Sequence, residues 1–273
     1  MCLDRPRDPL PTRVELCPPL PTEYAAALDA GLAALGLELT PGARVAIDGH
    51  VRLLIAWNVA INLTAIREPA AIAIRHVVDS LTGLTVLRER SIDRFVDLGS
   101  GGGFPGLTLA AARPADRALL IDSIAKKVRF LTTTIEAVGL SARVAAEPVR
   151  AESLAAGRDR GAWPAVTARA VGPLAELIEL GLPLLGPRGV LVAWKAGNPE
   201  DPDGLGGELA TAGRALGRID PGAAIIVRPV VAAARQPVVA DLADHRLVIV
   251  ERSRDSITET WPRDPAARRR SAW

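Results

Sequence analysis

A run of glycines behind one acid is the stretch of this chain whose residue types best suit chemistry. Residues 94–106 read Arg-Phe-Val-Asp-Leu-Gly-Ser-Gly-Gly-Gly-Phe-Pro-Gly, an apolar strand followed by a tight turn and a helix start. This order forms the first unit of a Rossmann-type sheet, in which ligands bind at the carboxyl ends of the strands. Because glycine has no Cβ, the backbone at Gly99, Gly101 and Gly103 can turn sharply and lie against a ligand.

The glycine run is compatible with two kinds of cofactor. Gly101 begins a Gly-x-Gly-x-x-Gly pattern, and Asp122 ends the next predicted strand about 20 residues later, as in dinucleotide-binding proteins. The same stretch reads Asp-x-Gly-x-Gly-x-Gly from Asp97, the arrangement of S-adenosylmethionine-dependent methyltransferases. A carboxylate beside a pyrophosphate would face like charge, so Asp97 favours a cationic sulfonium donor over NAD. Two structural roles stay open, with Asp97 as a capping acid and Asp122 as a turn acid.

Three further positions fit a methyltransferase. Ala151 and Glu152 follow the third predicted strand, where such enzymes often contact adenine through backbone and an acidic side chain. Arg169 ends the fourth predicted strand, which brings it to the same crevice of the sheet. The alternative for Arg169 is a simple ion pair with a nearby acid.

The elements that must position these residues alternate between strand and helix from Arg94 onward. Such alternation predicts an α/β, Rossmann-like sheet, mostly parallel, with the last strand antiparallel. The predicted strands are Arg94–Leu98, Ala118–Asp122, Ala142–Ala146, Ala165–Arg169, Gly189–Trp194, Ala223–Arg228 and Arg246–Glu251. The predicted helices between them lie near Gly103–Ala112, Ala125–Val138, Ala151–Ala156, Pro173–Leu185 and Pro202–Leu216.

The remaining segments suggest four parts. Residues 1–21 are rich in proline and charge, and we expect a flexible extension there. Residues 22–90 carry three stretches of helical periodicity and predict a helical cap. Residues 91–253 would form the cofactor-binding domain. Residues 254–273 form a basic tail, which is either a solvated terminus or a contact for phosphate.

Composition narrows the classes of protein. The 273 residues carry a formal net charge of +2, which does not by itself demand a nucleic-acid partner. Two cysteines ahead of the predicted core argue against a disulfide scaffold or a cysteine-rich zinc site, and we expect no metal. The first residues lack the apolar region of a signal peptide, and no apolar run is long enough for a bilayer. We therefore expect a soluble cytoplasmic protein without a membrane partner, acting as a monomer.

Several short segments occur together in an order typical of one family. They are Trp57-Asn58, Asn62-Leu63-Thr64, Arg75-His76-Val77-Val78-Asp79-Ser80, the glycine run with Phe104-Pro105-Gly106, Asp122-Ser123, Lys126-Lys127-Val128-Arg129-Phe130-Leu131, Arg150-Ala151-Glu152, Ala168-Arg169-Ala170, Trp194-Lys195-Ala196-Gly197 and Trp261-Pro262-Arg263. On these segments the chain resembles the bacterial 16S rRNA guanine-N7 methyltransferases, once called glucose-inhibited division protein B. The family often has leucine at the position of Phe104. Neither the first twenty residues nor residues 268–270 have a clear family counterpart.

The resemblance implies S-adenosylmethionine as cofactor and 16S rRNA, or the small ribosomal subunit, as partner, with guanine-527 as target. It places the cofactor at Gly99 and Phe104, at Ala151 and Glu152, and at Arg169. Naked RNA, an assembling subunit and a finished subunit stay open as substrates.

Guanine N7 carries a free lone pair and attacks a methyl group without losing a proton. The protein then has to supply alignment and exclusion of water rather than a general base. We expect His76, Asp79 and Ser80, at i, i+3 and i+4 of one helix, to hold the guanine or its strand, together with Asn62. Lys195 would reach RNA phosphate or the base edge. As an alternative, His76 holds the cap to the sheet through Asp79.

Two other functions stay open from the residues alone. One is an NAD-dependent oxidoreductase that uses the same glycine loop, although no hydride-transfer acid is recognisable. The other is a non-catalytic RNA-binding factor for ribosome assembly that keeps a decayed cofactor site.

Overall fold

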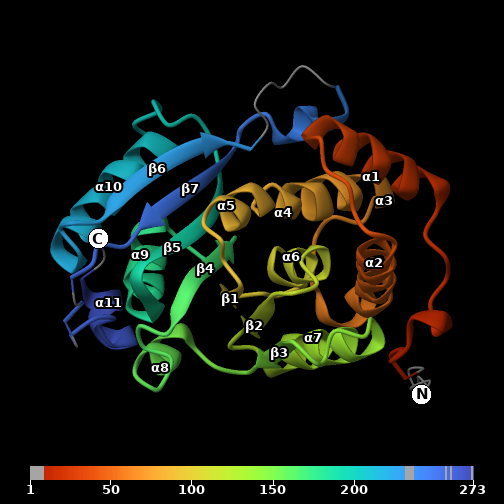
Figure 1. Ribbon diagram of the computed structural model, residues 1–273, viewed down its shortest axis with the longest axis horizontal. Coiled ribbons are helices and arrows are strands. Elements are labelled where there is room, and N and C mark those ends of the chain that lie inside the picture. Colours follow the sequence, from red (N-terminus) through yellow and green to blue (C-terminus); the bar gives the residue numbers. More distant parts are fainter. Residues whose placement is uncertain (1–8, 231–236, 256, 259, 272) are drawn as a thin grey trace, which may run out of the picture.

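The computed structural model describes residues 9–230, 237–255, 257–258, 260–271 and 273, and its centre is a seven-stranded mixed sheet (Figure 1). The strand order is β3-β2-β1-β4-β5-β7-β6. The strands are β1 (Arg94–Leu98), β2 (Arg117–Ile121), β3 (Val144–Glu147), β4 (Trp163–Arg169), β5 (Leu185–Ala196), β6 (Ala224–Pro229) and β7 (His245–Glu251). β1 to β5 pair in parallel, whereas β7 lies antiparallel between β5 and β6. The α/β class and the antiparallel last strand are therefore confirmed.

The strand order reverses between β1 and β4, which is where a doubly wound sheet binds its ligand. The predicted bounds of β1 are matched, and the other strands differ by a few residues. The largest difference is in β5, which begins at Leu185 rather than Gly189. β5 shifts its register against β4 between Trp163 and Ala165, so an irregular start of the strand passes through the Gly-Pro pair at 186–187.

Helices cover both faces of the sheet (Figure 1). Before the sheet come η1 (Val14–Leu16), α1 (Thr22–Leu35), α2 (Pro41–Ile61), α3 (Pro69–Ile72), the π-helical turn η2 (Ala73–Val78), α4 (Asp79–Leu81) and α5 (Leu84–Glu89). Within and after it come α6 (Gly106–Ala112), α7 (Ala125–Ala137), α8 (Ala151–Ala155), α9 (Leu174–Gly181), η3 (Leu182–Leu184), α10 (Leu205–Ile219), η4 (Pro237–Leu242) and α11 (Pro265–Arg270).

Two apolar cores result from the alternation of side chains along the strands. Phe95 of β1 packs with the cap helices, α6 and α7, while its neighbour Val96 packs with α8, α9 and α10 on the other face. Trp57 of α2 is among the largest buried side chains of the first core. The helices of residues 22–90 thus share a core with one face of the sheet.

The N-terminal segment is packed against the cap from Pro11 onward, which corrects the expectation of a flexible extension for that part. The Pro11 carbonyl accepts a hydrogen bond from Trp57 Nε1 at 2.8 Å, and the Pro18 carbonyl accepts one from Arg52 Nε at 2.9 Å. Cys17 is buried between them. Residues 1–8, which belong to the same predicted extension, lie outside the described residues.

The continuous helical run Pro69–Glu89 corrects the expectation about apolar segments. Its length and mean hydropathy of 1.4 would suffice to cross a membrane, but 72% of the tested window is buried inside the protein. Its side chains Ile72, Val77 and Leu81 belong to the core shared with β1. The run is therefore accounted for as a core helix.

The C-terminal segment is docked rather than solvated. Arg263 donates from Nε to Glu179 Oε1 at 2.9 Å and from Nη2 to Oε2 at 2.6 Å, and this glutamate on α9 is fully buried. Trp273 Nε1 donates to the same carboxylate at 2.8 Å, and its ring stacks on Trp261. Figure 1 shows α11 beside α8 and α9.

Candidate active site

The glycine loop is held in shape by the cap as much as by its own turns. Gly99, Gly101 and Gly103 have φ values of 63°, 51° and 90°, in the left-handed region where glycine is favoured. A Cβ on Gly103 would come within 2.7 Å of His50 Nε2, and this nitrogen donates to the Gly102 carbonyl at 2.7 Å. Close packing on α2 therefore requires glycine here, independently of any ligand.

A cavity of about 330 Å³ opens beside this loop, at the ends of β1, β2 and β3. Four of the predicted cofactor residues line it: Gly99, Asp122, Ala151 and Glu152. They come from three different chain segments, which the parallel sheet brings to one edge. Its walls combine apolar carbons with the carboxylates of Asp122, Glu152 and Glu176, which suits the adenosine part of a nucleoside cofactor.

Asp122 is fixed by the backbone around it. Its Oδ2 accepts from the Gly101 amide at 3.1 Å and its Oδ1 accepts from the Ile124 amide at 2.8 Å. Lys127 Nζ lies 3.8 Å from Oδ2. The role of a turn acid, left open by the sequence, is therefore real, and the same carboxylate still lines the cavity with acceptor capacity to spare.

Asp97 is not among the residues that line this cavity, and its contact with a cationic donor stays a prediction. Its carboxylate is fully buried behind the loop, where a Cβ on Gly106 would lie 2.6 Å from Oδ2. Thr167 donates to Oδ1 at 2.6 Å, and Oδ2 has no hydrogen-bond partner among the described residues. Burial raises the pKa of Asp97 to about 6, against lowering by hydrogen bonds from Thr167 and Ser100.

The other predicted cofactor residues lie beside this cavity rather than among the residues that line it. Phe104 is buried between two imidazoles, with ring centroids 4.6 Å from His50 and 4.7 Å from His76. The Arg169 guanidinium lies 5.5 Å from the centre of the Phe104 ring. Gly101 and Gly103 shape the turn between the residues that line the cavity and the pair Phe104 and Arg169.

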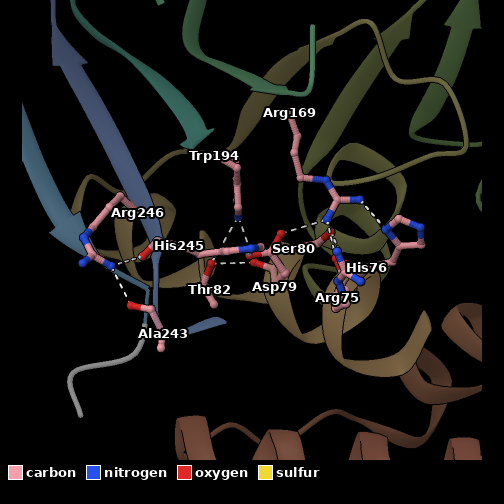
Figure 2. A network of polar contacts seen from close by, with 10 residues as sticks. All are labelled: Arg75, His76, Asp79, Ser80, Thr82, Arg169, Trp194, Ala243, His245 and Arg246. Carbon is pink, nitrogen blue, oxygen red and sulfur yellow. Dashed lines mark hydrogen bonds and ion pairs between the residues drawn. The ribbon is translucent and has the colours of Figure 1, made fainter. Parts of the chain in front are cut away.

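Arg169 is the centre of a polar network that joins the sheet to the cap (Figure 2). Its Nη1 donates to Asp79 Oδ2 at 2.8 Å and to the Arg75 carbonyl at 2.9 Å, and its Nη2 donates to His76 Nδ1 at 2.9 Å. The ion pair with an acid that the sequence left open for Arg169 is present. Asp79 is 1% exposed, so this pair is almost fully desolvated.

His76 is a neutral imidazole in this network. Because Arg169 donates to Nδ1, the proton is assigned to Nε2, which donates to Thr64 Oγ1 at 2.6 Å. Burial, followed by the charge of Arg169, lowers the pKa of His76 to about 3. His76 therefore links the cap to the sheet through Arg169, not through Asp79 as the alternative supposed.

Asn58 explains why Thr64 stands in reach of His76. Its Oδ1 accepts from the Leu63 and Thr64 amides at 2.7 and 3.0 Å, and its Nδ2 donates to the Thr64 carbonyl at 2.9 Å. These hydrogen bonds from the Asn58 side chain fix the backbone of the loop that follows α2. The Asn-Leu-Thr segment is part of the same network, and Asn62 caps α2 as an exposed residue in the left-handed region.

The three residues expected on one helical face do not share one environment. Asp79 and Ser80 are buried, and the Ser80 hydroxyl donates to the His76 carbonyl at 2.5 Å. Lys195 donates to the Gly172 carbonyl at 2.7 Å and to Glu208 at 2.5 Å. Asp79 and Lys195 line a cavity of about 190 Å³ together with Arg169, whereas His76, Ser80 and Asn62 are not among its lining residues.

His245 is the site residue that the sequence reasoning missed. Its Nδ1 lies 2.9 Å from Asp79 Oδ1 (Figure 2). It lines the same 190 Å³ cavity. The chain has three histidines, and the other two, His50 and His76, flank Phe104. The scarcity of histidine in the sequence is the one signal that could have drawn attention to His245. Among the residues that the structure describes, no cluster of histidine, cysteine, aspartate and glutamate suits a metal ion.

Comparisons with known proteins agree with this geometry. Residues 45–203 match the family model GidB, described as rRNA small subunit methyltransferase G. The chain is 39% identical over 211 residues to ribosomal RNA small subunit methyltransferase G of Sorangium cellulosum, covering 77% of this chain and 83% of that protein. It is 40% identical over 186 residues to the protein of the same name from Stenotrophomonas maltophilia, covering 67% and 82%.

A solved structure supports the fold. The O-methyltransferase from Bacillus cereus, in complex with SAH, superposes with a TM-score of 0.52 over 75% of this chain and 91% of that one. The identity is 16%, so this likeness concerns the Rossmann-like methyltransferase fold alone.

Proposed function

Because the chain belongs to the rRNA small subunit methyltransferase G family, we propose that it methylates N7 of a guanine in 16S rRNA. The family makes the chain an S-adenosylmethionine-dependent methyltransferase, so the interpretations as an NAD oxidoreductase or a non-catalytic assembly factor are not supported. By family resemblance the target is guanine-527. We further propose that the enzyme works as a monomer in the cytoplasm, without a membrane partner, on 16S rRNA or the small subunit.

One observation supports the position of the cofactor above the others. Gly99, Asp122, Ala151 and Glu152 line one cavity at the point where the strand order reverses. Asp122 is held by two backbone amides with its acceptor capacity unfilled, which suits the two hydroxyls of a ribose. Glu152, at the far wall, would accept from an exocyclic amine of adenine.

Bound S-adenosylmethionine supplies a methyl group that is activated by its sulfonium. The residues of the chain then have to align it with the guanine and exclude water, because N7 carries its own lone pair. The neutral state of His76, with a pKa of about 3, agrees with a reaction that requires no proton transfer from this imidazole at pH 7. The buried Arg169–Asp79 pair would fix the wall between the two cavities.

For the substrate, we propose that the 190 Å³ cavity lies along the path of the guanine or its neighbour. Asp79, Lys195 and His245 line it, and all three already accept or donate within the protein. His76 and Ser80 would then act by holding this wall in place, and Asn62 by its exposed position at the end of α2.

The experiment is a methyl-transfer assay with tritiated S-adenosylmethionine on naked 16S rRNA and on small subunits. We expect label in one guanine, identified as N7-methylguanosine by mass spectrometry and absent from rRNA of cells that lack the protein. Label on N1, N2 or the ribose would refute the N7 assignment. No transfer to either substrate would refute the proposed function.

A further inference from the structure

A third cavity adjoins the one assigned to the cofactor, and arginines dominate its wall. Its volume is about 430 Å³, and the docked C-terminal segment forms one side of it. The charged residues that line it are Arg150, Arg263, Arg268, Arg269, Glu176 and Glu179. Four arginines against two glutamates give this cavity a net charge of +2. It shares Arg150, Glu176 and Arg268 with the cofactor cavity.

The arginines of this cavity differ in how well acidic partners neutralise them. Glu179 is fully used, since Arg263 and Trp273 donate three hydrogen bonds to its buried carboxylate in addition to the Arg263 amide. Arg263 therefore serves to dock the segment. The other arginines are Arg150, Arg268 and Arg269, of which Arg268 is paired with Glu152 from the cofactor cavity.

Arg268 has donors without acceptors. Its Nη2 donates to Glu152, but its Nε and Nη1 are buried without a hydrogen-bond partner among the described residues. Glu176 Oε1 lies 3.8 Å from Nη1. Burial lowers the pKa of Arg268, and the charges of Arg150 and Arg269 lower it further. Buried donors beside like charges are the arrangement that an anion would relieve.

We propose that Arg150, Arg268 and Arg269 bind a phosphate of the RNA backbone next to the cofactor cavity. A phosphate offers several acceptor oxygens to a guanidinium, and arginine pairs with it in a two-pronged geometry. The side chains of Arg150 and Arg269 are exposed, so a polymer can reach the mouth of the cavity from the surface. The inference rests on the proposed function, because it takes rRNA as the substrate.

The test uses two substitutions at Arg269 and a matched pair of controls. Arg269→Ala and Arg269→Glu remove and reverse a charge on an exposed side chain, so the fold is expected to be kept. Arg158→Ala and Arg158→Glu make the same changes at a side chain that is 89% exposed and not among the residues lining the cavity. The measurements are Kd for a 16S rRNA transcript at several salt concentrations and Kd for S-adenosylhomocysteine.

We expect Arg269→Ala to weaken RNA binding roughly threefold to tenfold and to lower the slope of log Kd against log salt by about one. Arg269→Glu weakens it more, while the Arg158 variants and S-adenosylhomocysteine binding change less than about twofold. If the Arg269 variants bind and methylate rRNA like the wild type, this site is refuted while the proposed function stands.

A second arm separates RNA from free phosphate. Inorganic phosphate is titrated into the wild type and Arg269→Glu, with Tm as the readout and with labelled rRNA as competitor. Displacement of rRNA by phosphate, lost in the variant, supports the assignment. A phosphate effect on Tm without any change in RNA affinity would overturn it in favour of a free anion. A wild type that neither binds nor methylates rRNA would instead refute the proposed function.

Discussion

The two cavities at the carboxyl ends of the strands differ in how their polar groups are satisfied. In the 330 Å³ cavity, Asp122 is held by backbone amides and keeps acceptor capacity for a ligand. In the 190 Å³ cavity, Asp79 is already paired on one oxygen with Arg169 and on the other with His245. The polar groups of the first cavity are available to a ligand, whereas those of the second are used to hold the protein together.

The difference separates two uses of the same residue types. A carboxylate held by two amides, with Lys127 Nζ 3.8 Å away, still has lone pairs that can accept from a ribose. A buried carboxylate that pairs with a guanidinium through one oxygen and contacts an imidazole through the other is a rigid joint, because losing the guanidinium leaves a buried charge uncompensated. Arg169 therefore contributes to the site by fixing the position of Asp79 and His76 (Figure 2).

The largest effect is expected from breaking the joint. Asp79→Ala leaves Arg169 buried without its carboxylate, and we expect the free energy of unfolding to fall by about 3–5 kcal/mol. Urea denaturation measures it. Asp29→Ala is the control, since its pair with Arg44 involves a carboxylate that is 63% exposed and is expected to contribute less than about 1 kcal/mol. A loss at Asp79 as small as the control would mean that the network is not a structural joint.

The next effect is a pH dependence of the free energy of unfolding that comes from Asp97, which lines neither cavity. Because the folded pKa is about 6 and the reference value is 3.8, the folded protein binds the proton more tightly, and this group makes stability fall between about pH 4 and 6. Asp97→Asn removes this contribution to the pH dependence of stability, because asparagine does not titrate. We expect the difference in unfolding free energy between variant and wild type to move by about 2.4 kcal/mol in favour of the variant from pH 4 to pH 7.

The two buried histidines change stability with pH in the opposite direction to Asp97. Burial lowers the pKa of His50 to about 4 and that of His76 to about 3, so their terms make stability rise with pH above those values and up to about 6.5. Both are present in variant and wild type and cancel in the difference. A difference that is flat with pH would show that Asp97 is ionised in the fold at all of these pH values.

A smaller effect tests the open cavity directly. Asp122→Ala removes the carboxylate that lines it, and we expect binding of S-adenosylhomocysteine to weaken by about 1.5–3 kcal/mol, or roughly tenfold to a hundredfold. Isothermal titration calorimetry measures it. Asp116, an acid paired with Arg113 away from the lining residues, gives the matched variant Asp116→Ala, whose affinity should stay within about twofold. Equal losses in the two variants would indicate a general effect on the fold.

The sequence predicted the parts of this molecule that depend on local patterns. The bounds of β1 were predicted correctly because residues 95–98 form a short run that is buried on both faces of the sheet. Asp122 was predicted because its place at the end of a strand follows from the local pattern alone. β5 was shortened at its start because Gly186 and Pro187 read as a turn, whereas pairing with β4 and β7 keeps the strand.

The residues that the sequence missed are joined to the site by contacts between distant segments. His245 meets Asp79 across 166 positions, and Arg268 meets Glu152 across 116. Neither pair leaves a periodic or motif signal, because its geometry is set by the sheet and by the docked C-terminus. The same holds for Asp97, whose burial behind Gly106 follows from the packing of the loop and not from its place in the motif.

The smallest effect asks whether the two cavities act independently. His76→Ala removes an acceptor from Arg169 and a donor from Thr64, and we expect a loss of about 1 kcal/mol in stability, measured as a Tm lower by about 2–4 °C. Turnover should fall, while affinity for S-adenosylhomocysteine is unchanged, since His76 is not among the residues lining the cofactor cavity. The double variant with Asp122→Ala should then bind the cofactor product as weakly as Asp122→Ala alone, because sites without shared partners add. If the double variant binds less tightly than the single one by more than about 0.5 kcal/mol, the joint around Arg169 shapes the cofactor cavity as well, and the division between a binding region and a holding region is wrong.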